Sequence, residues 1–121
     1  MGNIVQVRQD DWQSIESSSK PVLVDFWAEW CPPCRMLAPT FERLAANYGE
    51  QISFAQVDVD ELPELAGQYG IRSIPTLLLL REGEVVEHIV GPRPYEDLAR
   101  LLDRHVAAGE KLQPRLVGLA N

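Results

Sequence analysis

The 121-residue chain contains only two cysteines, Cys31 and Cys34, which excludes a secreted miniprotein held together by several disulfides. A structural zinc site is also disfavoured, because such a site usually has four ligands and His88 and His105 lie far from the cysteines in the sequence. We therefore predict no bound metal and interpret the two cysteines as a pair.

Basic residues and long apolar runs are scarce as well. The 11 Lys and Arg against 18 Asp and Glu give a net charge of −7, which repels a phosphate backbone and predicts no nucleic-acid partner. No apolar run approaches the roughly 20 residues of a membrane-spanning helix, which predicts no membrane partner. Residues 1–10 lack the basic and then apolar pattern of a secretory signal, so we expect a cytoplasmic protein.

The remaining pattern is that of one α/β domain, since the length and the 45% hydrophobic content fit a single core. Strands are predicted at 4–7, 22–28, 53–59, 77–80 and 85–90, and helices at 11–16, 34–48, 62–69 and 95–106. This order predicts parallel strand–helix units followed by an antiparallel hairpin. We assign residues 1–106 to the domain and 107–121 to a C-terminal tail that is disordered or loosely docked.

The two cysteines have C-x-x-C spacing at the junction between the buried strand 22–28 and the helix that follows. A helix N-terminus carries partial positive charge and free N–H groups, which favour a thiolate. Lowering a thiol pKa from about 8.5 to about 7 makes roughly half of it thiolate at neutral pH. Cys31 precedes the helix and is expected to be the exposed nucleophile. Cys34 lies one turn into the apolar face and is expected to be more buried, placed to resolve a mixed disulfide.

Two other interpretations of this pair are a static disulfide and two idle core thiols. A bridge that encloses two residues constrains little of the unfolded chain, so stability is a poor reason for it. Pro32 and Pro33 suit the first turn of a helix, where the N–H groups that they lack would be unpaired. We therefore favour a redox pair.

Asp25 is a carboxylate within the apolar run at 22–28. Burial is expected to raise its pKa, which would make it usable as an acid or base near neutrality. The alternative is a buried aspartate satisfied by local hydrogen bonds. Taken alone, Trp27 and Trp30 would be interpreted as core residues, and Pro75 as an ordinary proline at the start of a strand.

Several segments together resemble the thioredoxin family. They are Val-Asp-Phe-Trp-Ala-Glu-Trp-Cys-Pro-Pro-Cys-Arg-Met-Leu-Ala-Pro at 24–39, Val-Asp-Val-Asp at 57–60 and Tyr-Gly-Ile-Arg-Ser-Ile-Pro-Thr at 69–76, followed by Gly83 and Gly91. The resemblance covers about residues 4–106. It implies a thioredoxin fold, with a central five-stranded mixed sheet of order 1-3-2-4-5 flanked by four helices.

The resemblance also implies roles for individual residues. Cys31 resembles the attacking cysteine, Cys34 the resolving cysteine and Asp25 the buried acid that handles the proton of Cys34. The implied activity is that of a protein-disulfide reductase that reduces disulfide-containing client proteins. The implied electron donor is an NADPH-dependent thioredoxin reductase, and we expect a monomer that holds no cofactor of its own.

A substrate groove is implied in the same way. Pro75 resembles a cis-proline that faces the cysteines, and Ile74 resembles the residue that presents its backbone to an extended substrate. Trp30 and Gly91 resemble the rim of the groove, and Trp27 resembles the aromatic residue that braces the site. Two other functions stay open at this point, an oxidase or isomerase of an oxidising compartment and a partner-binding or chaperone module with secondary redox activity.

Two positions depart from the common family pattern. Pro32 occupies the place of the usual glycine between the cysteines, which removes one N–H donor from the helix start and stiffens the turn. Gln56 occupies a place where many members have lysine near the buried acid. The loss of that charge is expected to leave the pKa of Asp25 higher still.

Overall fold

The computed structural model describes residues 3–106, so the predicted tail at 107–121 lies outside the described residues. In chain order the elements are β1 (Ile4–Gln6), the 3-10 helix η1 (Gln9–Asp11), α1 (Trp12–Glu16), β2 (Val22–Trp27), α2 (Pro32–Tyr48), β3 (Ser53–Asp58), α3 (Pro63–Gln68), β4 (Thr76–Arg81), β5 (Glu84–Val90) and α4 (Tyr95–Asp103). Within this range, none of the helices combines the length and the apolar character needed to cross a membrane.

The five strands form one sheet in the order β1-β3-β2-β4-β5. The first three strands along the chain are parallel, whereas β4 runs antiparallel to both β2 and β5. This arrangement confirms the predicted mixed sheet, its strand order and its four α-helices. The 3-10 helix η1 was not predicted, and its turn is closed by the backbone N–H of Arg8, which donates to Asp11 Oδ2 at 2.9 Å.

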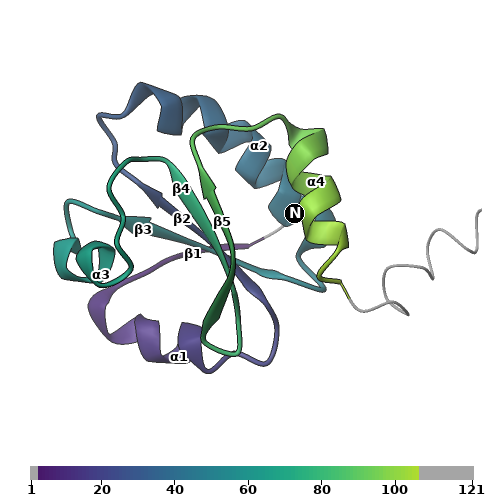
Figure 1. The fold of residues 1–121 in the computed structure, drawn as a ribbon, viewed down its shortest axis with the longest axis horizontal. Coiled ribbons are helices and arrows are strands. Elements are labelled where there is room, and N and C mark those ends of the chain that lie inside the picture. Colours follow the sequence, from purple (N-terminus) through teal and green to yellow (C-terminus); the bar gives the residue numbers. More distant parts are fainter. Residues whose placement is uncertain (1–2, 107–121) are drawn as a thin grey trace, which may run out of the picture.

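The sheet is covered on both faces, with α2 and α4 on one side and α1 and α3 on the other (Figure 1). Side chains alternate along a strand, so β2 contributes to both cores. Val24 packs in the cluster that contains Ala66 of α3, and Leu23 packs in the cluster that contains Phe41 of α2. Asp25 follows Leu23 by two residues, and therefore points to the α2 side of the sheet.

The hairpin between β4 and β5 has a two-residue turn, Glu82 and Gly83, with φ values of 52° and 83°. Two successive positive φ values match the twist of the flanking strands, and glycine adopts them without a Cβ penalty. This turn brings β5 back along β4, and its last residue, Val90, pairs with Thr76 at the start of β4. The far end of the hairpin therefore lies next to the Ile74–Pro75 segment.

Candidate active site

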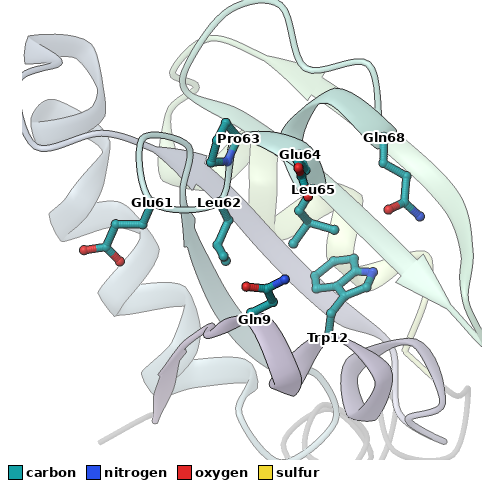
Figure 2. A pocket seen from close by; sticks show the side chains of 8 residues that line it. All are labelled: Gln9, Trp12, Glu61, Leu62, Pro63, Glu64, Leu65 and Gln68. Atoms are coloured by element: carbon teal, nitrogen blue, oxygen red, sulfur yellow. The ribbon is translucent and has the colours of Figure 1, made fainter.

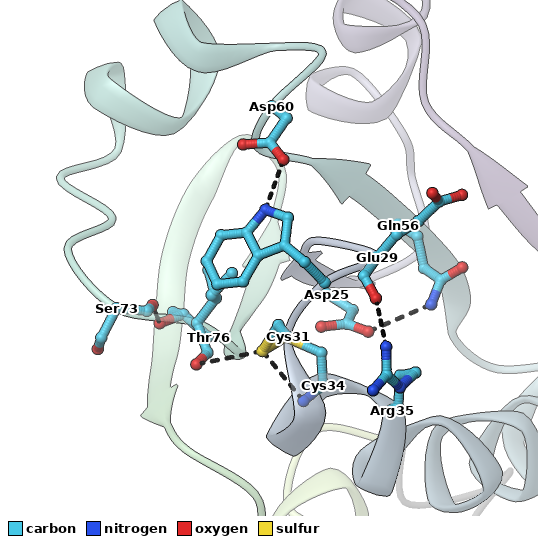
Figure 3. Close-up of a disulfide and its surroundings, with 11 residues drawn as sticks. Asp25, Glu29, Cys31, Cys34, Arg35, Gln56, Asp60, Ser73 and Thr76 are labelled. Carbon is cyan, nitrogen blue, oxygen red and sulfur yellow. Dashed lines mark hydrogen bonds between the residues drawn. A yellow bond between two sulfur atoms is a disulfide. The ribbon is translucent and has the colours of Figure 1, made fainter.

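Cys31 and Cys34 form a disulfide at the N-terminus of α2, with their Cα atoms 5.2 Å apart (Figure 3). Cys31 is the N-cap residue, and Pro32 and Pro33 occupy the first turn, as predicted. Because neither proline has an N–H group, the first free backbone donor of the helix is that of Cys34. This N–H donates to Cys31 Sγ at 3.2 Å. The helix start thus directs its first available hydrogen bond at the sulfur of Cys31.

The expected exposure of Cys31 is wrong for the disulfide form of the protein. Cys31 is 2% exposed and Cys34 is 3% exposed, so the two residues are equally buried. The sulfur of Cys31 lies 3.8 Å from the carbonyl oxygen of Ile74, and the side chains of Trp27 and Ile74 pack against the pair. The loop that precedes β4 therefore covers the sulfur, a tertiary contact that helix position alone does not indicate.

Asp25 is buried beside this pair and is 1% exposed (Figure 3). Its Oδ2 accepts a hydrogen bond from Gln56 Nε2 at 3.2 Å, whereas its Oδ1 is buried without a hydrogen-bond partner in the described part of the chain. Burial raises the pKa of Asp25 from 3.8 to about 6, and the hydrogen bond from Gln56 acts in the opposite direction. The predicted rise is confirmed, and the carboxyl group can gain or lose a proton near neutral pH.

The peptide bond between Ile74 and Pro75 is cis, as the resemblance implied. The carbonyl oxygen of Pro75 accepts a 2.8 Å hydrogen bond from the N–H of Gly91, which has a φ of 86°. Thr76 Oγ1 donates to the carbonyl oxygen of Ser73 at 2.7 Å. These two bonds anchor the loop on both sides of the cis bond, and they hold the Ile74 carbonyl beside the disulfide.

The two tryptophans differ in environment. Trp30 is 63% exposed, and its indole N–H donates to Asp60 Oδ2 at 2.7 Å. Trp27 is partly buried against the disulfide, and its Nε1 has no hydrogen-bond partner among residues 3–106. Trp30 therefore lies on the surface next to the disulfide, where the resemblance placed the rim. The sequence reasoning missed Asp60 as its partner, although an aspartate directly after a buried strand was a usable signal.

A hollow of about 200 Å³ adjoins the site and is lined by Trp30, Val59, Ala66, Ile71, Arg72, Ser73 and Ile74. A larger hollow of about 540 Å³ lies between η1 and α3 (Figure 2). Its lining includes Trp12 and Glu64 but none of the predicted site residues, so it belongs to a different part of the molecule. Within residues 3–106, no group of three or more His, Cys, Asp or Glu side chains is arranged to hold a metal ion.

Comparison with known proteins identifies the family. The family model described as Thioredoxin matches residues 3–104. The chain belongs to the thioredoxin family. Thioredoxin 1 of Synechococcus elongatus is 50% identical over 94 residues, which cover 78% of this chain and 88% of that protein. The thioredoxin of Bacillus subtilis is 50% identical over 93 residues, 77% and 89% of the two chains. That of Staphylococcus epidermidis is 48% identical over 104 residues, 85% and 98%.

As a member of the thioredoxin family, the chain is a thiol-disulfide oxidoreductase with protein-disulfide reductase activity. The Cys31–Cys34 disulfide is its redox-active group. A purely static bridge and a pair of idle thiols are thereby set aside. The geometry adds that a helix N-terminus and a carboxyl group that titrates near neutrality lie at the same disulfide.

Gln56 offers a direct test of how the surroundings of Asp25 set its protonation. We expect Gln56→Lys to lower the pKa of Asp25 by about one unit or more, because an ammonium group beside a carboxylate favours its charged form. The measurement is an NMR titration of the Asp25 carboxyl carbon. Gln56→Met is the matched control, since methionine has a similar length but cannot donate a hydrogen bond. In this variant the pKa of Asp25 should lie above its value in the wild type. An unchanged midpoint in Gln56→Lys would contradict the expectation.

Proposed function

We propose that Cys31 is the nucleophile in the reduction of client disulfides. Its thiolate attacks one sulfur of the client disulfide, a bond forms between Cys31 and that sulfur, and the other client sulfur leaves as a thiolate that takes up a proton. The observation that carries this assignment is the Cys34 N–H directed at Cys31 Sγ at 3.2 Å. A backbone donor at a helix N-terminus stabilises a thiolate at Cys31. Cys34 lies inside the helix and does not occupy the N-cap position.

In the second step, Cys34 resolves the mixed disulfide. The proton of the Cys34 thiol passes to the Asp25 carboxylate, and the resulting thiolate attacks Cys31 Sγ. The bond between Cys31 and the client breaks, and the client sulfur leaves as a thiolate that takes up a proton. The client has then gained two electrons, and the protein, which has lost them, is left with the Cys31–Cys34 disulfide. The burial of Asp25 supports its role as the proton acceptor, as does its Oδ1, which has no hydrogen-bond partner among residues 3–106.

We further propose that the client binds as an extended segment across the loop before β4. Ile74 and Pro75 would offer the backbone, Trp30 and Gly91 would form the rim, and Trp27 would brace the disulfide from behind. The Ile74 carbonyl beside Cys31 and the exposure of Trp30 support this arrangement. An extended segment placed there lies over the covered sulfurs, so its own disulfide would meet Cys31 directly.

The partners in this proposal are disulfide-containing client proteins and a thioredoxin reductase that supplies electrons from NADPH. The test is the reduction of a client protein disulfide in the presence of thioredoxin reductase and NADPH, monitored as the loss of NADPH absorbance. Turnover that depends on this chain is the expected result, and its absence would contradict the proposal. The cytoplasmic location, the monomeric state and the domain boundary at residue 106 stay predictions.

We expect Pro32, within the segment Trp-Cys-Pro-Pro-Cys at 30–34, to influence how readily Cys31 ionises. Pro32→Gly restores one backbone N–H at the helix start, so the ratio of thiolate to thiol at Cys31 should rise about two- to fivefold, the magnitude of a favourable interaction between an anion and the partial positive charge of a helix N-terminus. The ultraviolet absorbance of the thiolate measures this ratio as a function of pH. Pro33→Ala restores an N–H one residue further on and serves as a comparison. A titration curve of Pro32→Gly identical to that of the wild type would exclude tuning by Pro32.

A further inference from the structure

Three polar residues occupy register positions on neighbouring strands of the sheet, in a row that includes the active-site residue Asp25. Gln6 of β1 pairs with Gln56 of β3, and Gln56 pairs in turn with Asp25 of β2. Residues in register on neighbouring strands point to the same face, so all three side chains point to the α2 side. The row begins at an exposed residue of an edge strand and ends at a buried carboxyl group.

Two side-chain hydrogen bonds connect this row, and in each the donor lies on the Gln6 side and the acceptor on the Asp25 side. Gln6 Nε2 donates to Gln56 Oε1 at 2.6 Å, and Gln56 Nε2 donates to Asp25 Oδ2 at 3.2 Å. A glutamine amide has an acceptor oxygen on one side and a donor NH2 on the other. With its oxygen held by Gln6, the amide of Gln56 turns its NH2 group to Asp25. In this arrangement the donor end of Gln56 meets the carboxyl group while its acceptor end is held by Gln6.

The orientation of Gln56 matters because its two ends have opposite effects on Asp25. An NH2 donor stabilises the carboxylate, whereas a carbonyl oxygen in the same place accepts from, and so stabilises, the protonated acid. Among the residues drawn near Asp25 in Figure 3, Glu29 and Arg35 are charged and exposed, and Cys34 at the start of α2 carries a thiol in the reduced protein. Asp58 lies two residues beyond Gln56 on β3. Arg35 donates to the carbonyl oxygen of Glu29 at 2.8 Å.

We propose that Gln6 is a positioning residue for the proton transfer at Asp25, because it holds the Gln56 amide with its NH2 group toward the carboxylate. The inference rests on the proposed function, in which Asp25 takes the proton of Cys34. Gln6 itself touches neither sulfur nor client in this arrangement. It acts through Gln56, from a surface position that tolerates substitution without loss of the core.

The experiment combines substitutions at Gln6 with an NMR titration of the Asp25 carboxyl carbon. Gln6→Met cannot donate and leaves the Gln56 amide free to turn, so the midpoint should rise by about 0.5 to 1 pH unit, the effect of one hydrogen bond. Gln6→Glu can only accept, which turns the NH2 group of Gln56 away from Asp25, and its midpoint should rise further. Gln6→Lys can only donate, so its midpoint should stay at or below that of the wild type.

Two controls separate the orientation of Gln56 from the charge of the new side chain. Val5→Glu places the same charge on the neighbouring residue, whose side chain points to the other face of the sheet, and should shift the midpoint less than Gln6→Glu does. In a Gln56→Met background, Gln6→Glu should lose most of its effect. Equal shifts with and without Gln56, or an unshifted midpoint in both Gln6→Met and Gln6→Glu, would overturn the inference.

The same variants distinguish this inference from the proposed role of Asp25. The rate of mixed-disulfide resolution should follow the Asp25 titration in the wild type, and its pH profile should move with the midpoint in each variant. A wild-type rate profile that does not follow the titration of Asp25 would overturn the proposed proton transfer. Unshifted titration midpoints in the Gln6 variants would overturn only the positioning role of Gln6 and leave the proposed role of Asp25 intact.

Discussion

Replacing Cys31 with serine should abolish disulfide reduction, and replacing Cys34 with serine should trap the protein on its client. A serine hydroxyl does not form the nucleophilic anion near neutral pH, so Cys31→Ser should lose about three orders of magnitude or more in rate. Cys34→Ser keeps the attacking sulfur but lacks the resolving one. It should therefore accumulate one covalently bound client per chain, which intact mass spectrometry would detect as a reductant-sensitive adduct.

The comparison between the two variants assigns the order of attack. Cys31→Ser serves as the matched control for the adduct, since it also retains a single cysteine. That cysteine, Cys34, lies inside the helix and not at its N-cap. A faster adduct on Cys34 in Cys31→Ser than on Cys31 in Cys34→Ser would reverse the proposed roles, and equal rates would contradict the assignment of Cys31 as the nucleophile. Turnover retained without Cys31 would instead favour the alternative of a partner-binding module in which the redox chemistry is secondary.

Replacing Asp25 with asparagine should stabilise the protein at alkaline pH while slowing the resolving step. Burial raises the pKa of Asp25 to about 6 in the folded chain, above the unfolded value near 3.9. The folded state therefore binds more protons than the unfolded state between these values, and stability falls as the pH rises from about 4 to about 7. The shift corresponds to about 3 kcal/mol, most of which Asp25→Asn should recover at pH 8.

Urea unfolding at acidic and alkaline pH measures this effect. The free energy of unfolding of the wild type should fall relative to that of Asp25→Asn across this range, and the two should converge below about pH 4. Asp60→Asn replaces an exposed aspartate of the same site and serves as the matched control for the change of side chain. Resolution of the mixed disulfide should slow by about a hundredfold in Asp25→Asn, because the proton acceptor is lost. Parallel stability curves for wild type and Asp25→Asn would contradict the assigned burial cost.

Much of this site follows from local sequence, because its main determinants are local. The C-x-x-C spacing, the buried strand before it and the two prolines together predict a helix that starts at the cysteines, and α2 begins at Pro32. Asp25 lies inside a run of apolar residues, which was enough to predict a raised pKa. The strand order and the cis bond before Pro75 came from the resemblance to a family, since neither periodicity nor composition distinguishes them.

The features that escaped prediction depend on contacts between distant segments. Cys31 is covered because the loop at Ile74 folds over it, and 43 residues separate the two positions. Gln6 faces Gln56 only through the register between β1 and β3, which the alternation of either strand alone does not determine. The hydrogen bond from Trp30 to Asp60 likewise joins the ends of two different strand–helix connections.

The cover over the disulfide also has a consequence for which molecules can exchange electrons with the protein. Thiol–disulfide exchange requires an attacking sulfur to reach its target in line, and here both sulfurs lie beneath side chains and a carbonyl group. We expect a small thiol in solution to reach these sulfurs slowly, whereas a macromolecule bound along the loop, as proposed above, would displace the cover. We therefore expect small thiols to reduce the oxidised chain more slowly than a protein thiol that docks along this loop.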